Sequence, residues 1–210
     1  MERRSKPIII IEHLEDTLGT WVFLEYRHSS MIYGKEYLWF TNIPLKYHRL
    51  MQRYGRVFKE SILQLIERNM LKTEELLILD PRAEETLAYS DLLDYKYIVV
   101  GGILGDHPPR GRTYELLTSR IRGVDSRNIG DKQYSIDGSV YYVEFLWKNK
   151  SMENYEFVDG VTLDTNYGNI YLPYRYPLIN NKPLIAPGLV EYLKNEKLPR
   201  EILEEIGLTK

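Results

Sequence analysis

Short apolar runs, each ending in polar or glycine-rich sequence, constrain the fold of this chain most strongly. Residues 7–11 read Pro-Ile-Ile-Ile-Ile, residues 76–79 read Leu-Leu-Ile-Leu, and residues 97–100 read Tyr-Ile-Val-Val. Continuous aliphatic and β-branched runs of this length are typical of strands that are buried on both faces in a parallel sheet. Helix-like sequence separates the runs. The chain is therefore predicted to have an α/β fold with a mostly parallel sheet and helices on both faces.

The segments between and after these runs predict further elements. Residues 46–70 carry apolar side chains at helical spacing and predict a helix that breaks near Gly55. Asp16 and Thr17 are candidate caps for a helix that carries Trp21. The other expected elements are a strand at 37–41, a short helix at 87–95, extended segments at 155–165 and 169–179 that meet in a hairpin around 166–168, and helices at 189–195 and 199–206.

Composition removes several classes of site. The 210 residues include no cysteine, which excludes disulfides, thiolate metal ligands and a cysteine nucleophile. The four histidines are scattered along the chain, so no metal is expected. A formal net charge of −2 argues against indiscriminate nucleic-acid binding. The apolar run at 8–11 is too short for a signal core or a membrane span, which predicts a soluble cytoplasmic protein without a membrane partner.

A glycine- and proline-rich segment at 101–113 follows directly after the third apolar run. It reads Gly-Gly-Ile-Leu-Gly-Asp-His-Pro-Pro-Arg-Gly-Arg-Thr. Glycines let a backbone approach a ligand closely, and parallel sheets bind ligands at the carboxyl ends of their strands. The segment matches neither the Gly-x-Gly-x-x-Gly pattern of dinucleotide sites nor the Gly-Lys-Ser/Thr ending of a phosphate loop. A tight turn without a ligand explains the same residues equally well on composition alone.

Five sequence motifs occur in the order found in one known family and span nearly the whole chain. The segment 101–113 carries the closest likeness. The other motifs are Ile-Glu-His-Leu-Glu at 11–15 with Trp-Val-Phe-Leu-Glu-Tyr at 21–26, Leu-Asp-Pro-Arg-Ala at 79–83, Ile-Gly-Asp-Lys-Gln at 129–133, and a tail with Leu-Pro-Tyr-Arg-Tyr at 172–176 and Lys-Pro-Leu-Ile-Ala-Pro-Gly at 182–188. Together they resemble a family of SPOUT-class methyltransferases. Its fungal members methylate an arginine of small-subunit ribosomal protein S3, and its archaeal members are described as RNA methyltransferases.

This resemblance implies a fold, a cofactor and a division of the chain. The implied fold is a knotted α/β core at residues 1–150, with a deep trefoil knot in its C-terminal half, and an extension at 151–210 that packs on the core. S-adenosylmethionine (SAM) is the implied methyl donor, held by three loops of the knot. The implied cofactor-binding residues are Leu79, Asp80, Pro81, Gly101, Gly102, Ile103, Leu104, Gly105, His107, Asn128, Ile129, Gly130, Lys132 and Gln133. A monomer is also implied, because in the fungal relatives the tail covers the usual dimer surface of SPOUT enzymes.

Methyl transfer to an arginine requires a carboxylate near the acceptor. A guanidinium has a pKa above about 12 and must lose a proton before its nitrogen can attack. The candidate catalytic carboxylates are Glu12, Asp106 and Asp131, which lie in motifs near expected strand ends. In the structural alternative, Asp106 caps the following turn. Asp80 is equally well explained as a turn residue.

The expected substrate-binding residues are His13, Arg110 and Arg112. His13 and His107 are also candidate proton relays, although a neutral His107 packed in the core is the favoured alternative. The fungal motif has an acidic residue between its two arginines where this chain has Gly111. One potential carboxylate near the site is therefore missing.

Basic residues near the motif are also consistent with RNA as the methyl acceptor. They are Arg110, Arg112, Arg120, Arg122, Arg127 and Lys132, with a further stripe at Arg49, Arg53 and Arg56. Such residues contact RNA phosphates in some proteins and form ordinary surface ion pairs in others. Tyrosines at 167, 171, 174 and 176 are expected to pack the tail onto the core rather than to stack on bases.

Three functions are consistent with these residues and motifs. The first is SAM-dependent methylation of an arginine in a small-subunit ribosomal protein. The second is methylation of an rRNA or tRNA nucleotide. The third is a module that binds the cofactor or RNA without turnover.

Overall fold

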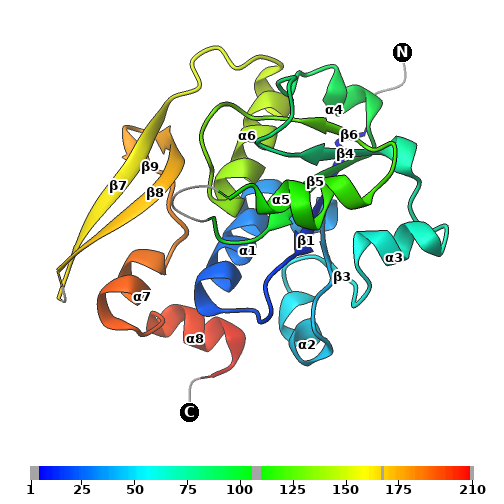
Figure 1. Cartoon of the computed structure of the whole chain (residues 1–210). Helices are drawn as coiled ribbons and strands as arrows, with labels where there is room; N and C mark the ends of the chain where they lie inside the picture. The colour runs from blue at the N-terminus through cyan, green and yellow to red at the C-terminus, as the bar shows by residue number, and fades with distance from the viewer. Residues whose placement is uncertain (1–4, 106–109, 167, 209–210) are drawn as a thin grey trace.

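A six-stranded parallel sheet forms the centre of the molecule (Figure 1). The computed structural model describes residues 5–105, 110–166 and 168–208. The strands lie in the order β3-β2-β1-β5-β4-β6, and each neighbouring pair is parallel. Their bounds are Ile8–His13 for β1, Leu38–Thr41 for β2, Arg56–Val57 for β3, Leu76–Leu79 for β4, Tyr97–Gly102 for β5 and Asp125–Arg127 for β6. The α/β class and the parallel sheet are confirmed.

Helices cover both faces of the sheet because successive side chains of a strand point in opposite directions. Ile9 and Ile11 of β1 share a core with α1 and α6, whereas Ile10 packs with α3 in a second core on the other face. The helices are α1 (Thr20–Tyr33), α2 (His48–Met51), α3 (Ile62–Glu67), α4 (Asp91–Asp94), α5 (Arg112–Leu116) and α6 (Ile136–Asn149), with 3-10 helices at Lys35–Tyr37, Leu45–Tyr47, Thr73–Glu75 and Thr118–Arg120. The trefoil knot implied by the resemblance concerns the path of the chain through its own loops and stays a prediction.

Residues 46–70 do not form the single broken helix that their apolar spacing predicts. They contain α2, β3 and α3, because Arg56 and Val57 pair with β2 and extend the sheet. Ser61 then begins α3 with a capping box, in which its hydroxyl accepts from the Gln64 amide and the Gln64 side chain accepts from the Ser61 amide. The helix expected at 87–95 is also shorter, since α4 covers only its last part.

A three-stranded antiparallel sheet follows α6. Strand β7 (Phe157–Thr165) pairs with β8 (Gly168–Ile179), which pairs with β9 (Lys182–Pro183). The expected hairpin is confirmed by the pairing of β7 with β8, and Tyr167 lies outside the described residues. Tyr174 and Tyr176 of β8 are buried, as the packing interpretation predicts, whereas Tyr171 is 56% exposed.

The last two helices attach the tail to the main core. Leu189 of α7 (Leu189–Asn195) and Ile202 of α8 (Arg200–Ile206) are buried in the same core as α1 and α6. Glu205 accepts hydrogen bonds from the Arg27 guanidinium and, at 2.7 Å, from the Tyr54 hydroxyl. The tail therefore packs on the main core, while the division at residue 150 stays a prediction.

The described part of the chain offers neither a membrane span nor a metal centre. None of its helices is long and apolar enough to cross a bilayer, and none of its acidic and histidine side chains gather in groups of three or more that could hold a metal ion.

Candidate functional site

A cavity of about 280 Å³ opens at the carboxyl ends of β4 and β5. Its walls come from four segments: the end of β4 and the loop after it, the end of β5 and the loop after it, the start of α5, and the segment that leads into α6. Because β4 and β5 are neighbours in a parallel sheet, the loops that follow them leave the sheet side by side. The apolar residues that line the cavity are Leu79, Val100, Ile103, Ile129 and Ile136.

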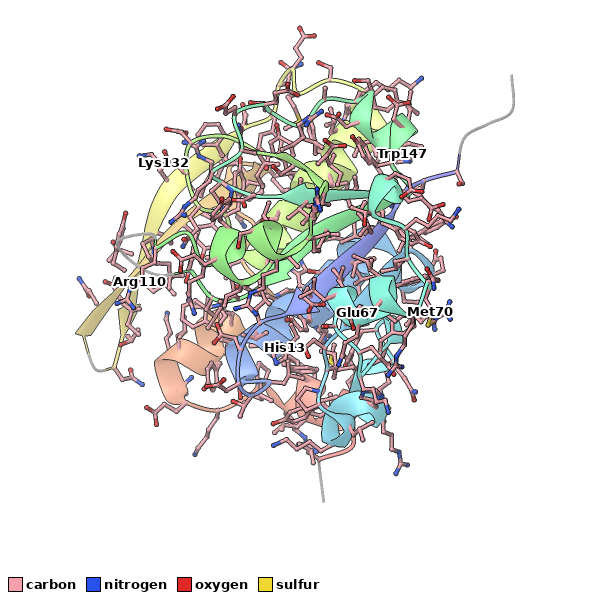
Figure 2. All side chains as sticks on the ribbon, turned by 45° about the vertical axis from the view of Figure 1, so that its right-hand side comes forward. His13, Glu67, Met70, Arg110, Lys132 and Trp147 are labelled. Carbon is pink, nitrogen blue, oxygen red and sulfur yellow. The ribbon has the colours of Figure 1, made fainter. Side chains whose placement is uncertain are left out.

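Most of the predicted site residues meet at this cavity. Those that line it are Leu79, Asp80, Pro81, Gly101, Ile103, Gly105, Arg110, Arg112, Ile129, Gly130, Asp131, Lys132 and Gln133. Those that do not are Glu12, His13, Gly102, Leu104 and Asn128. Asp106 and His107 lie outside the described residues. In Figure 2, Lys132 and Arg110 lie on the side of the molecule that carries the hairpin, and His13 lies apart from Lys132.

Asp80 fixes the first cavity loop. Its Oδ1 accepts from the Arg82 amide at 2.9 Å, and its Oδ2 accepts from the Thr118 hydroxyl at 2.6 Å. The side chain is buried, and both of its oxygens are engaged in these bonds. These bonds match the turn interpretation of Asp80 and join the loop after β4 to the segment after α5.

Asn128 fixes the third cavity loop from behind. Its Nδ2 donates to the Ala83 carbonyl at 2.9 Å, and its Oδ1 accepts from the Thr86 hydroxyl and from the Gly130 amide. It therefore holds the loop at 128–133 against the segment after β4 instead of facing the cavity.

Gly105 and Gln133 form the tightest contact between two cavity loops. A Cβ at Gly105 would lie 1.5 Å from Nε2 of Gln133, so a larger residue there would force the Gln133 side chain out of its position. That Nε2 is buried and finds no hydrogen-bond acceptor among the described residues. Because a buried donor without an acceptor costs about 1–3 kcal/mol, this amide fits a ligand that supplies the acceptor.

Glu15 shapes the second cavity loop and is absent from the predicted site. Its Oε1 accepts from the Leu104 amide at 2.9 Å and lies 3.9 Å from the Arg112 guanidinium, which itself donates to the Leu104 carbonyl. The backbone of Leu104 is thus held by Glu15 and Arg112, and the Arg112 guanidinium is partly engaged in fixing the loop. The signal for Glu15 was its place in the motif at 11–15.

Arg82 occupies the space beside the glycine that replaces the fungal acid. Gly111 has a φ of +71° at the start of α5, and a Cβ there would lie 2.3 Å from Nε of Arg82. The guanidinium donates to the Arg110 carbonyl at 3.1 Å and lies 3.4 Å from a Glu115 carboxylate oxygen. Arg82 lines the cavity, although the sequence pattern predicted no role for it.

Glu12 lies on the α3 face of the sheet and away from the cavity. Its Oε2 accepts from the Thr41 hydroxyl at 2.5 Å and from the Ile62 amide at 3.0 Å, at the first turn of α3. Burial raises the pKa of Glu12 to about 7, against the lowering effect of these two hydrogen bonds. The geometry gives Glu12 a role in anchoring α3 and no contact with the cavity.

His13 is fully buried behind the β5 loop. Its Nδ1 lies 3.0 Å from the Tyr26 hydroxyl, which donates to the Gly102 carbonyl at 3.3 Å. Since the hydroxyl proton points to Gly102, Nδ1 of His13 is the donor to the tyrosine oxygen. Burial lowers the pKa of His13 to about 4, so the ring is neutral at pH 7. His13 and Gly102 support the loop from below and do not reach the cavity.

Asp131 projects from the cavity rim and meets the C-terminal hairpin. Its side chain is 75% exposed, and its Oδ1 accepts from Nη1 of Arg175 at 3.0 Å. Arg175 also forms two hydrogen bonds to Asp159, at 2.6 and 2.8 Å, and these lower the pKa of Asp159.

Strand β8 also holds two cavity loops through Tyr174 and Arg175. The Arg175 amide donates to the Gln133 carbonyl at 2.8 Å. The neighbouring Tyr174 hydroxyl donates to the Gly105 carbonyl at 3.0 Å. The hairpin is therefore part of the cavity's construction.

Comparisons with known proteins agree with this arrangement. The model of a family described as protein arginine N-methyltransferase SFM1-like matches residues 8–198. The chain is 32% identical over 200 residues to protein arginine N-methyltransferase SFM1 of Saccharomyces cerevisiae. The aligned region covers 89% of this chain and 94% of the yeast protein. It is also similar to the crystal structure of the yeast arginine methyltransferase SFM1 complexed with SAM, with a TM-score of 0.79, 30% identity, and 91% of this chain and 92% of that chain covered. A Trm10 structure from Thermococcus kodakaraensis has a TM-score of 0.52 at 19% identity, over 70% of this chain and 95% of that one, which is a likeness of fold alone.

Proposed function

The chain belongs to the SFM1-like family of protein arginine N-methyltransferases, and from this premise we propose that its acceptor is an arginine of a small-subunit ribosomal protein. It is a SAM-dependent methyltransferase of that family. Bound SAM supplies a methyl group on a positively charged sulfonium. The chain's own task is to align the acceptor nitrogen with that methyl group and to receive the proton that the guanidinium loses.

The observation that carries the proposal is the combination of an apolar slot and an unused amide donor in one cavity. Leu79, Ile103 and Ile129 offer apolar walls of the kind that an adenine ring requires. Nε2 of Gln133 offers a buried donor that has no acceptor among the described residues. The residues present therefore fit SAM.

Asp131 is the carboxylate that we assign to the arginine. Two carboxylates line the described part of the cavity, and Asp80 uses both of its oxygens within the protein. Asp131 is exposed at the rim and already accepts from one guanidinium. As the nitrogen–methyl bond forms and the sulfur–methyl bond breaks, Asp131 takes up the proton from the guanidinium nitrogen.

Methylation of RNA is the alternative, and the arginines at the cavity favour it. However, Arg82 and Arg112 donate to backbone carbonyls and lie near acidic partners, and Arg127 pairs with Glu85 at 3.1 Å. Much of the positive charge that would contact phosphates is thus compensated within the chain.

Transfer of labelled methyl groups separates these two functions. The purified chain is incubated with radiolabelled SAM and undermethylated ribosomes, and the protein is then separated from the RNA. We expect label in an arginine of a small-subunit protein. Label in RNA alone would refute the proposed acceptor.

We also propose that the chain acts as a monomer in the cytoplasm. The contacts of Glu205 with Arg27 and Tyr54 hold α8 against α1 and the segment after α2, which supports the expectation that the tail covers the usual dimer surface of SPOUT enzymes. Sedimentation equilibrium is expected to give the mass of one chain at micromolar concentration. A mass of two chains would contradict this part of the proposal.

A further inference from the structure

A basic surface is formed by α2, β3 and the residues that flank them. Residues 37–59 contain no aspartate or glutamate, whereas the whole chain has a formal net charge of −2. The lysines and arginines of this segment are all exposed, and we call them the basic surface: Lys46, Arg49, Arg53, Arg56 and Lys59. Positive charge is therefore concentrated locally, as it is on proteins that bind polyanions.

The fold brings the two ends of this segment together. Strand β3 pairs with β2, and α2 contacts β3. The Asn42 amide donates to the Glu60 carbonyl at 2.8 Å, so Lys59 lies beside the residues that lead to Lys46. The cations before and after β3 thus belong to one surface.

The basic surface keeps its charge because the acids next to it are engaged elsewhere. Glu60 pairs with Arg68, and Glu205 pairs with Arg27. Three cations of the surface form no ion pair with an acidic side chain of the described residues, namely Lys46, Arg49 and Lys59. This distinguishes them from the arginines at the cavity, which lie near carboxylates.

Aromatic rings restrain part of this positive charge. The Arg56 guanidinium lies 4.8 Å from the ring centroid of Trp39 and 4.9 Å from that of Phe58. Nζ of Lys46 lies 4.8 Å from the ring centroid of Tyr47. A ring face attracts a cation without neutralising it, so these charges are held in place and remain available to an anion.

The spacing and chemistry of the surface fit a line of phosphates. Its cations at 46, 49, 53 and 56 recur every three or four residues, and a planar guanidinium binds two phosphate oxygens at once. Every exposed residue from 46 to 59 is charged or polar, with the exposed Leu45 at the border. Stable protein interfaces bury an apolar centre, whereas the RNA backbone is bound mainly through its charge.

The basic surface and the cavity are separate. The cavity opens at β4 and β5, and β2 and β1 lie between β3 and β5 in the sheet. In Figure 1, α2 lies apart from α6 and from the β7–β8 hairpin. RNA on the basic surface is therefore bound at a distance from the methyl donor.

We propose that the basic surface binds the phosphate backbone of RNA through contacts that do not depend on base sequence. The inference goes beyond the proposed function, because RNA bound here anchors the enzyme and is not the methyl acceptor. A substrate particle that combines protein with RNA is thereby held at two places.

Fluorescence anisotropy with a fluorescein-labelled RNA duplex of about 16 base pairs tests this surface at several KCl concentrations. The double variant Lys46→Gln/Arg49→Gln is expected to raise the Kd for the duplex about ten-fold. It should also make the slope of log Kd against log KCl shallower by about 2, because two phosphate contacts are lost. Arg49→Lys keeps the charge and should keep this slope.

The matched control is the double variant Lys35→Gln/Lys72→Gln. Both lysines are exposed and lie shortly before β2 and β4, at the amino ends of the strands. This control removes the same charge from the chain and should leave both the Kd for RNA and its salt slope unchanged. Both double variants should bind SAM like the wild type.

Three results would overturn the basic surface as an RNA site. They are a wild-type chain that does not bind the duplex, equal effects of the two double variants, and tighter binding of fluorescein-labelled polyglutamate than of RNA, which would identify an acidic protein as the partner. The ribosome experiment is independent of these results. Label in RNA alone would remove the proposed acceptor, whereas the duplex titration alone decides the basic surface.

Discussion

At the scale of single residues, the cavity depends on side chains that hold loops as much as on side chains that face a ligand. Asp80, Asn128 and Glu15 each accept from a backbone amide of a cavity loop. Such residues sit in the motifs beside the ligand-facing ones, because a loop must be fixed before it can bind. The resemblance therefore implied a cofactor contact both for Asn128, which lies behind the loop, and for Gln133, which lines the cavity.

Replacing Gln133 by methionine removes an amide donor while it keeps the length of the side chain. We expect the Kd for SAM to rise about two- to ten-fold in isothermal titration calorimetry, since one hydrogen bond contributes about 0.5–1.5 kcal/mol. The thermal stability of the free protein should not fall, because the wild-type Nε2 has no acceptor among the described residues. Gln52→Met, at an exposed position, is the control. Unchanged affinity in Gln133→Met would place this amide outside the cofactor site.

Replacing Glu12 by glutamine tests both its burial and its assignment as a base. The pKa of Glu12 is raised from 4.5 to about 7 in the folded protein, so the folded chain keeps a proton that the unfolded chain releases between these values. Stability of the wild type should therefore fall as pH rises through this window, by at most about 3 kcal/mol. Urea unfolding at pH 4.5 and 7.5 should show a smaller fall for Glu12→Gln.

Methyl transfer by the Glu12→Gln variant provides the second readout. Because Glu12 lies on the α3 face and away from the cavity, turnover should persist at pH 7. A folded variant without turnover would return Glu12 to the catalytic group.

At the scale of elements, strands were predicted better than helices. The runs at 7–11, 76–79 and 97–100 became β1, β4 and β5, since a buried strand shows itself as a local apolar run. The single broken helix predicted at 46–70 was wrong, because the helical spacing there arises from α2 and α3 separately. Strand β3 between them is defined by its pairing with β2. Pairing with a distant strand leaves little trace in local sequence.

The hairpin contacts predict that β8 contributes to cofactor binding. Tyr174→Phe removes the hydroxyl that donates to the Gly105 carbonyl and keeps the aromatic ring. We expect the Kd for SAM to rise about three-fold, with little change in the kcat at saturating SAM, since the hydroxyl steadies a loop. Tyr47→Phe, beside α2, is the matched control. Equal SAM affinities for the two variants would limit the hairpin to a role outside the cofactor site.

At the scale of the whole molecule, the tail and the sheet share one core. Ile202 of α8 is 4% exposed and packs in the cluster that contains α1 and α6. Ile202→Ala is expected to destabilise the whole chain by about 2–4 kcal/mol, because the shorter side chain leaves a cavity in the core. Differential scanning calorimetry should record one transition that moves to lower temperature. A separate early transition for the tail would instead support an independent unit after residue 150.

The sequence by itself determined the α/β class, the family and most of the residues at the cavity, because buried strands and loop motifs are local patterns. Only the tertiary structure decided which motif residues share the cavity. Glu12 and His13 are adjacent in β1 and point to opposite faces of the sheet, and neither reaches the cavity, whereas Asp131 and Arg175 meet across 44 positions. The physical reason is that the direction of a side chain and its distant contacts depend on strand order and packing, which no short stretch of sequence encodes.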